Sequence, residues 1–519
     1  MINVSEGWIE AHKGTLLPET FIEVTYMASE PGLQQEARAE CNLETAFSEG
    51  MTLTSTLDRG SEKYNSLEWN LWGLDGSFTY FDGSPVSPGY VTANLSGEAA
   101  AFDALPTITL SFLGVHTALI PGITIKWSEA YEEWASKFRV TAFNGTQPLA
   151  QQVVSSNTGT TMQVWFDLSN YDKIVIEVLE WSHPYRRART ASVYLGIHTV
   201  YLKEDLLSFS HTQSVDLLSA TLPKNEITFV LRNEDERWNP DNPVGAERYL
   251  LERQEIAVRY GMDVDGTVEW IEGGRFWLSA WNTPANGLEA SFTARDILEF
   301  ANEEYTGPLS GNLYSMANAA FAQMNLPILA DGRDRYFVSG TLGAYSTDLT
   351  EGTGSQSYKI SDILQMIAHM GCCVIYQTRD GVMHIEPRVV LVSDYWVDRN
   401  NSYSHPEFTI SKPLKAVVVD YGDNQKITLS NSNSGEVQTI SNAMIQTQND
   451  AVRVGQAAVN LLTGRKTISG EYRADPRMDV LDMIAVQSKY STNDVVVTDV
   501  TYTTTGGAFR GRFTGRAVF

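Results

Sequence analysis

Eight dispersed histidines are the side chains of this sequence best suited to metal binding or acid–base catalysis. None of them lies four residues from another, so no helix can carry a local His-x-x-x-His zinc site. His369 and His384 could meet in space, but packed structural histidines are the simpler interpretation of both. The sequence therefore predicts no locally encoded metal site.

Two pairs of adjacent carboxylates could suggest a glycosidase, Glu132-Glu133 and Glu303-Glu304. A glycosidase needs two carboxyl groups about 5 to 10 Å apart across a sugar cleft. Neighbouring side chains on a strand point to opposite faces, so adjacency in sequence does not supply that geometry. We interpret both pairs as solvated. The oxygen-rich run 233–242 lacks the spacing of a calcium loop, and a turn fixed by Pro240 explains it better.

Catalytic motifs with fixed spacing are missing from the sequence. It contains no His-Glu-x-x-His, no Gly-x-Ser-x-Gly, no Gly-x-x-x-x-Gly-Lys and no Gly-x-Gly-x-x-Gly. We therefore expect no catalytic residue, no cofactor and no metal, and a protein that is not an enzyme.

The composition is that of a folded chain of several domains. It has 519 residues, of which 43% are hydrophobic and 19% charged, and this length exceeds what one core usually organises. A net charge of −25 argues against a nucleic-acid channel or an anionic membrane surface, which need clustered cations. The first residues show no basic region followed by an apolar core, so we expect no signal peptide, and no later stretch has the roughly 18 apolar residues of a membrane span. We expect Cys41, Cys372 and Cys373 to be reduced and packed, as suits a reducing cytoplasm.

Alternating apolar residues predict a β-domain that is interrupted by a second one. The alternation begins at Phe21–Tyr26, continues through Ala37–Leu43, and resumes after residue 205. Between 50 and 204 lie six of the twelve tryptophans, among short strands separated by turns, which is typical of an antiparallel sandwich. We therefore assign 1–49 and 205–300 to a first β-barrel and 50–204 to an inserted β-sandwich.

Helical periodicity appears only in the second half of the chain. It predicts helices at Ala294–Tyr305, Tyr314–Met324 and Ser361–Met370, the last capped by Ser361 and ended by Gly371. A hairpin follows, with its turn at Arg379-Asp380-Gly381. These elements indicate a small α+β domain over 301–404. The fold class expected overall is mainly β with α+β parts.

The last segment, 405–519, is expected to form a second barrel with a helix at 450–462. Glu255–Val258 is echoed by Met483–Val486, and Phe292–Arg295 by Phe513–Arg516. Coincidence between two β-domains of the same alternation explains this echo as well as duplication does. If the echo is real, the chain contains two similar barrels.

Two groups of residues resemble known families. Phe229–Asn233, Trp238–Pro243 and Gln254–Val258, with Asp475–Ile484, resemble the tail-tip or baseplate hub proteins of long-tailed phages and related injection systems. The resemblance implies two barrels per chain, and a homotrimer whose six barrels match the hexameric tail tube. It also implies partners in the tube or distal tail ring and in tip or fibre proteins, and a place in the virion after assembly in the host cytoplasm.

The inserted segment resembles a discoidin-like, galactose-binding-like sandwich in Leu74–Phe81 and in Arg186–Arg189 with Ser192–Gly196. The loop Trp181–Arg187 should then lie at the tip far from the insertion point. Aromatic rings beside polar groups can stack on a sugar and bond its hydroxyls, although the same rings could simply pack the sandwich or a neighbouring subunit. The candidate contacts with a host glycan or a partner are Tyr80, Phe81, Trp181, His183, Tyr185 and Arg186.

Two other functions compete with the hub. A carbohydrate-binding surface protein would use the sandwich as its working part, but the missing signal peptide speaks against it. A cell-wall hydrolase would need the catalytic spacing that the sequence lacks.

Overall fold

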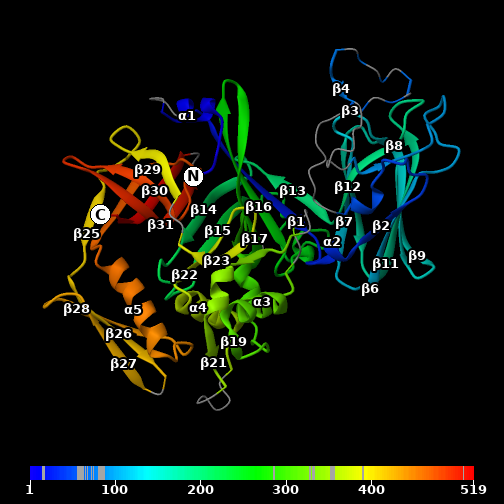
Figure 1. Ribbon diagram of the computed structural model, residues 1–519. Helices are drawn as coiled ribbons and strands as arrows, with labels where there is room; N and C mark the ends of the chain where they lie inside the picture. Colours follow the sequence, from blue (N-terminus) through cyan, green and yellow to red (C-terminus); the bar gives the residue numbers. More distant parts are fainter. Residues whose placement is uncertain are drawn as a thin grey trace.

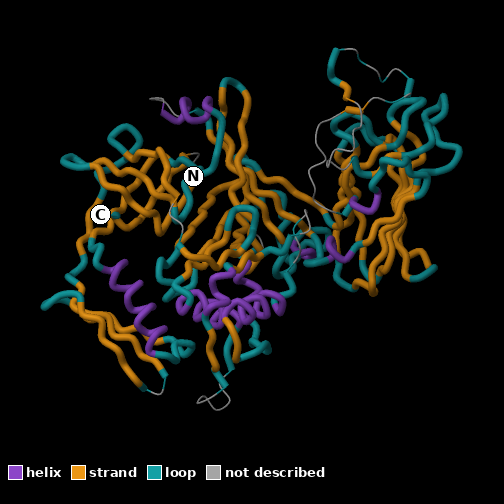
Figure 2. The backbone as a smooth tube through the Cα atoms, in the orientation of Figure 1, coloured by secondary structure: helices purple, strands orange, loops and turns teal. Residues whose placement is uncertain are grey.

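The protein is described from a computed structural model of the whole chain. The described residues are 1–13, 18–54, 88–284, 287–326, 333–350, 357–388, 391–422, 424–505 and 508–518, with residue 329 and parts of 63–79. They form a central β-region, a sandwich to one side and a helical layer below the centre (Figures 1 and 2).

The first unit is a run of antiparallel strands in the order β13-β1-β16-β17-β18-β15-β14. Alternate side chains of these strands are buried, as the sequence pattern predicts, and the inward residues of β15 include Ile227, Phe229 and Leu231. The strands are β1 (Thr20–Ala28), β13 (Ile197–Tyr201), β14 (Leu206–Ser214), β15 (Lys224–Arg232), β16 (Glu255–Val264), β17 (Thr267–Asn282) and β18 (Glu289–Arg295).

The second unit repeats this arrangement. Strands β25-β29-β32-β31-β30 pair in the order of β14-β15-β18-β17-β16. Along the chain the corresponding strands also succeed one another alike, as β25, β29, β30, β31, β32 and as β14, β15, β16, β17, β18. The echoed stretches lie on corresponding strands, β16 with β30 and β18 with β32. The strands are β24 (Leu391–Val397), β25 (Glu407–Ile410), β29 (Lys466–Arg473), β30 (Asp482–Gln487), β31 (Thr492–Thr505) and β32 (Ala508–Ala517).

A bulge confirms that the two units correspond in detail. The register between β17 and β18 shifts between Leu278 and Ala280, and the register between β31 and β32 shifts between Val497 and Asp499. These shifts face equivalent positions of the echoed stretches on β18 and β32. Coincidence of alternation would not place a bulge at the same point twice, so the structure favours duplication.

Strand β14 joins the two units by pairing with β31, which makes one thirteen-stranded sheet over one shared hydrophobic core. The mainly β class with α+β parts is confirmed. Strand pairing among the described residues closes neither unit into a barrel. Each unit is an open sheet where the sequence predicted a barrel.

The sandwich packs a five-stranded sheet, β2-β6-β11-β8-β9, against a four-stranded sheet, β10-β7-β12-β5. Trp127, Phe138 and Trp181 meet edge to face in its core. Its strands are β2 (Arg38–Cys41), β5 (Tyr90–Val91), β6 (Thr107–His116), β7 (Ile120–Trp127), β8 (Ala135–Asn144), β9 (Gln147–Val154), β10 (Thr161–Leu168), β11 (Tyr171–Trp181) and β12 (Arg189–Leu195), with β3 (Lys63–Tyr64), β4 (Phe78–Thr79), α2 (Leu33–Glu36) and η1 (Gly50–Thr52) nearby.

The boundaries of this insertion differ from those expected at 50 and 204. Arg38–Cys41 pairs with β6 of the sandwich, and Leu33 packs into the sandwich core. The first unit takes only β1 from the N-terminal segment, since β1 is the strand that pairs with β16. At the other end β13 pairs with β1, so the chain has left the sandwich by Ile197.

The α+β region packs two helices on a three-stranded sheet, β20-β23-β22. The helix expected at Ala294–Tyr305 is wrong: β18 runs to Arg295, and a 3-10 helix capped by Asp296 follows. The elements are α3 (Leu313–Gln323), α4 (Ile360–Met370), β19 (Ser310–Asn312), β20 (Tyr336–Val338), β21 (Ser346–Asp348), β22 (Cys373–Gln377), β23 (Met383–Pro387), η3 (Ile297–Asn302) and η4 (Gly340–Ala344). The 3-10 helix η2 (Glu247–Tyr249) belongs to the first unit, between β15 and β16.

Two details of the α+β assignment also need correction. Helix α4 begins after Lys359, whose backbone N–H donates to the Asp362 carboxylate, so Ser361 is inside the helix and is not its cap. Gly371 ends the helix as predicted. Strand β24 lies in the range expected for this domain, yet it pairs with β30 of the second unit.

Between β25 and β29 the chain forms a small sheet, β27-β26-β28, covered by one helix. That helix was expected at 450–462 and runs from Gln448 to Leu462. A further helix near the N-terminus packs on the second unit, where His12 lies 3.2 Å from the carbonyl oxygen of Ala474. The elements are α1 (Glu6–Lys13), α5 (Gln448–Leu462), β26 (Leu414–Tyr421), β27 (Gln425–Ser430) and β28 (Glu436–Ser441).

Candidate functional site

Of the six side chains predicted to contact a glycan or partner, four lie in described residues. Tyr80 and Phe81 lie outside the described residues. Trp181 and Arg186 are buried, Tyr185 is half-buried and His183 is exposed. Trp181 is the last residue of β11, and the other three lie on the loop from β11 to β12. Trp181 and Arg186 are therefore packed inside the sandwich, whereas Tyr185 and His183 reach its surface.

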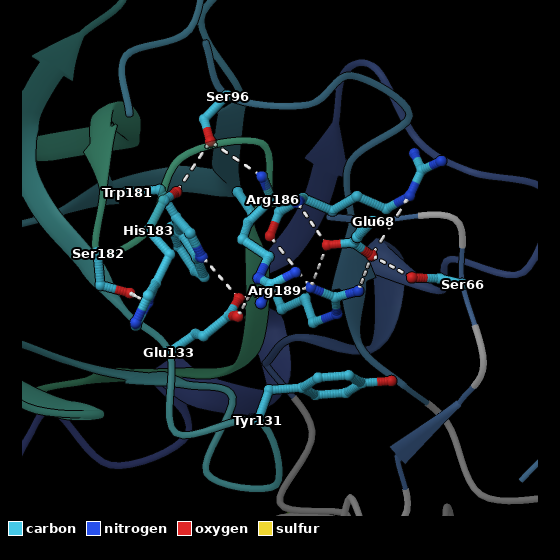
Figure 3. Close-up of polar contacts among 12 residues, drawn as sticks. Ser66, Glu68, Ser96, Tyr131, Glu133, Trp181, Ser182, His183, Arg186 and Arg189 are labelled. Carbon is cyan, nitrogen blue, oxygen red and sulfur yellow. Dashed lines mark hydrogen bonds and ion pairs between the residues drawn. The ribbon is translucent and has the colours of Figure 1, made fainter. Parts of the chain in front are cut away.

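Glu133 is the centre of a buried ionic network beneath this loop (Figure 3). Arg186 Nε lies 2.8 Å from Glu133 Oε1, and Arg189 Nη1 lies 3.6 Å from Glu133 Oε2. Trp181 Nε1 donates to Glu133 Oε2 at 2.9 Å. The interpretation of Glu133 as solvated is therefore wrong, whereas its neighbour Glu132 is exposed. Sequence alone could not show that two arginines would surround one member of the pair.

A second carboxylate, Glu68, completes the network. Arg189 Nη1 donates to Glu68 Oε2 at 2.9 Å, and the backbone N–H of Arg187 donates to the same oxygen at 2.8 Å. Burial acts to raise the pKa of Glu68, but the hydrogen bond and charge of Arg189 outweigh it, so the pKa is lowered. The Tyr131 ring lies 4.1 Å from the Arg189 guanidinium carbon. Glu68 is thus held charged, and both carboxylates are paired with arginines.

This network fixes the shape of the loop and leaves Trp181 and Arg186 engaged inside the sandwich. Removing one partner of a buried ion pair strands the other charge, which commonly costs about 3 to 5 kcal/mol. Trp181 and Arg186 therefore position the site from inside the sandwich. A ligand would contact the exposed side chains above them.

The surface above the network carries an aromatic pair that the sequence analysis did not single out. Trp69 is 60% exposed, and its ring centroid lies 5.0 Å from that of Tyr185. Arg186 Nη1 donates to the Trp69 carbonyl oxygen, so the buried network also positions Trp69. The sequence around Trp69 gives no signal of this exposure, because Leu67, Trp69 and Leu71 alternate with polar residues, a pattern that predicts an inward-facing ring. Trp69, Tyr185 and His183 are the side chains available to a ligand at this tip.

The second candidate site is the seam between the two units. We use the term internal seam for the pairing of β14 with β31, from Ser208 opposite Thr505 to Ser214 opposite Asp499. His211 lies in this seam, fully buried, with Nδ1 2.7 Å from the Tyr260 hydroxyl. Burial lowers the pKa of His211 to about 3, so the ring is neutral. The seam is therefore a closely packed joint, with His211, Val500 and Tyr502 fully buried.

Within the described ranges, no three His, Cys, Asp or Glu side chains lie together as an ion would require. In those same ranges no helix combines the length and apolar character needed to cross a membrane. The three cysteines are free, and burial raises the pKa of Cys373 to about 12.

Comparison with known proteins gives structural neighbours only. No protein-family model matches the chain, and no curated protein matches it. A prophage MuSo2 43 kDa tail protein from Shewanella oneidensis is 12% identical, with a TM-score of 0.41, and the alignment covers 61% of this chain and 94% of that one. A tail protein from Neisseria meningitidis MC58 is 10% identical, with a TM-score of 0.41, covering 62% and 93%. Tail proteins are among its structural neighbours.

A third neighbour is smaller. The chitosan-binding module 1 of a Paenibacillus chitosanase/glucanase is 13% identical, with a TM-score of 0.21, and the alignment covers 33% of this chain and 99% of the module. At these identities and scores, the likenesses do not assign an activity or a ligand.

Proposed function

We propose that the chain is a structural, non-catalytic hub of a phage-type tail tip or baseplate. It would assemble as a homotrimer whose six units form a pseudo-sixfold ring. The observation that carries this proposal is the duplication: two units with the same strand order and the same bulge are joined edge to edge in one chain. The strand-start motifs that resemble hub proteins lie on these two units.

The symmetry argument is physical. The joint between the units is head to tail, since the edge of β14 in the first unit meets β31 in the second. Contacts of this kind either close into a ring or run on as a filament. A chain with two near-equivalent units can close as a trimer and still offer six similar surfaces, which is what contact with a hexameric tube requires.

The partners and place of the protein follow from that ring. A tail tube or distal tail ring would contact one side, and tip or fibre proteins the other, in a virion assembled in the host cytoplasm. The net charge of −25 suits a protein without affinity for nucleic acid.

The test is the mass of the full-length chain by analytical ultracentrifugation over a wide concentration range, with antibody labelling of tails from an infecting phage. We expect a trimer at the distal end of the tail. A chain that stays monomeric at every concentration and is absent from tails would contradict the hub.

A second role is favoured by the exposed Trp69–Tyr185 pair. We propose that the tip of the sandwich contacts a glycan on the host surface through Trp69, Tyr185 and His183. An indole and a phenol side by side offer a sugar ring apolar faces, and His183 adds a polar group. Its alternative, packing against a neighbouring subunit, would bury the same rings in the assembled tip.

A further inference from the structure

The duplication lets each residue of the internal seam be matched to one in the second unit. Ile227 on β15 lies opposite Ala294 and His211, while Ile468 on β29 lies opposite Gly515 and Phe408. Ala294 and Gly515 are equivalent members of the echoed stretches. Phe408 on β25 therefore occupies the position that His211 occupies on β14, and by the same count Ile410 corresponds to Gln213.

The exposure of these matched residues differs sharply. His211 is 0% and Gln213 4% exposed, because β31 covers their strand. Phe408 is 41% and Ile410 65% exposed, and β25 pairs only with β29 among the described residues. Large apolar side chains thus lie exposed on the edge strand β25, whereas the corresponding strand β14 is covered by β31. An exposed apolar edge strand favours pairing with another strand.

The strand edge that would pair with β25 lies on β17, the strand of the first unit that corresponds to β31. Beyond its bulge, β31 pairs with β32 on one edge and with β14 on the other. Beyond the equivalent bulge, β17 pairs with β18 through Ala280, Trp281 and Asn282, and its other edge carries no strand among the described residues. Trp281 corresponds to Val500, which is fully buried in the internal seam, whereas Trp281 is half-buried.

We propose that β25 of one copy pairs antiparallel with β17 of a second copy of this chain, repeating the internal seam between subunits. The register of the internal seam places Thr409 opposite Asn282 of the partner subunit and Ile410 opposite Trp281 of the partner subunit. The joint is short, because Pro284 lacks the N–H that would extend it. This inference rests on the proposed ring and names the surface that closes it.

The chemistry of the two edges is complementary. Pairing supplies main-chain hydrogen bonds to two unpaired strand edges, and the packing of an isoleucine against an indole buries apolar area on both sides. A β-branched residue opposite an aromatic one is a favourable cross-strand pair. One seam within each chain and one between neighbouring chains then give every unit the same two neighbours.

The first test is a disulfide between subunits in the full chain. Thr409→Cys with Asn282→Cys places two thiols directly opposite each other in the proposed register, at a separation that suits a disulfide. We expect covalent dimers and closed trimers on a non-reducing gel. Thr409→Cys with Ala280→Cys, two residues out of register, should cross-link at least tenfold less, as should either single variant and the parent chain with its three native cysteines. Thr212→Cys with Thr501→Cys, opposite each other in the internal seam, is the positive control.

The outcomes separate the seam from the hub. A trimer by mass that gives no in-register cross-link would overturn the seam and leave the hub intact. A chain that is monomeric at every concentration would overturn both.

The second test is Ile410→Arg, a change at an exposed position that the folded single chain tolerates. We expect the Ile410→Arg trimer to dissociate at a protein concentration at least tenfold higher than that at which the parent trimer dissociates. The thermal unfolding midpoint should be unchanged. Val244→Arg, at a residue 79% exposed and outside both edges, is the matched control and should leave assembly unchanged. Assembly of Ile410→Arg at the parental concentration would also overturn the seam.

Discussion

Arg379 Nε lies 2.9 Å from Asp479 Oδ2, and this ion pair ties the α+β hairpin to the second unit. The same guanidinium donates to the carbonyl oxygens of Glu272, on β17, and Met478, at 2.8 and 3.2 Å. One buried side chain therefore links the first unit, the second unit and the α+β region.

Replacing Arg379 should loosen this joint. Arg379→Met keeps the length of the side chain but leaves Asp479 and three carbonyl oxygens without their donor, so we expect a loss of about 3 kcal/mol in the free energy of unfolding. The readouts are the unfolding midpoint in urea and the rate of limited proteolysis near residues 472–482. Arg399→Met, at an exposed arginine, should change neither. Equal behaviour of the two variants would show that the joint is not critical.

Asp296 should make stability depend on pH. Burial raises its pKa to about 7, although the carboxylate accepts a hydrogen bond from the N–H of Leu298 at 3.0 Å. Because the folded pKa lies above the unfolded value, the stabilisation is complete below about pH 3.9 and is lost as pH rises through about 7. The parent chain should therefore lose stability between pH 5 and pH 8 from this group.

The comparison variant is Asp296→Asn, which cannot ionise and still offers an oxygen to Leu298. We expect its free energy of unfolding to change by about 2 kcal/mol less than that of the parent between pH 5 and pH 8. Subtracting the two pH profiles removes the contribution of other groups, including His211, which titrates at lower pH. Parallel profiles for the two proteins would contradict the buried ionisation.

The sequence predicted the β-class, the interruption of one β-region by another, and helix α5 to within two residues at its start. These features follow from local alternation and periodicity, which side-chain burial dictates directly. The echo between the units was visible as well, but only the shared bulge distinguished duplication from coincidence. The order of strands within the sheet depends on contacts far apart in the chain, which no local pattern records.

The site shows the same limit. The sequence predicted Trp181, Tyr185 and Arg186 as contacts, yet it could not tell that Trp181 and Arg186 are buried. Glu133 looked solvated because its partners, Arg186 and Arg189, lie more than fifty residues away. Trp69 alternates with Leu67 and Leu71 in the sequence, which predicts a buried ring, yet its side chain is 60% exposed.

The adjacent residues Glu132 and Glu133 offer a matched pair for testing the buried network. Glu133→Gln removes the charge that Arg186 and Arg189 share, so we expect a loss of about 3 kcal/mol in the stability of the sandwich. Glu132→Gln changes an exposed side chain and should shift the unfolding midpoint very little. Thermal unfolding followed by tryptophan fluorescence would report on Trp181, which donates to Glu133. Identical midpoints for both variants would contradict the network.

Trp69 and Trp165 provide the corresponding test for glycan contact, because both are exposed on the sandwich, at 60% and 47%. Trp69→Ala removes the stacking surface beside Tyr185, whereas Trp165→Ala removes a comparable ring that lies under Arg237 of the first unit. On an array of host surface glycans, probed with the intact chain, we expect Trp69→Ala to lose at least tenfold in apparent affinity and Trp165→Ala to bind as the parent does. Loss of a stacked ring commonly costs about 1 to 2 kcal/mol of binding free energy, and about 1.4 kcal/mol corresponds to a tenfold change in affinity.

The Trp69–Tyr185 pair is not a sugar-binding surface if the parent binds no glycan or if both variants bind equally well. In that case, protection of Trp69 from oxidation in assembled tails would identify the pair as a contact between subunits.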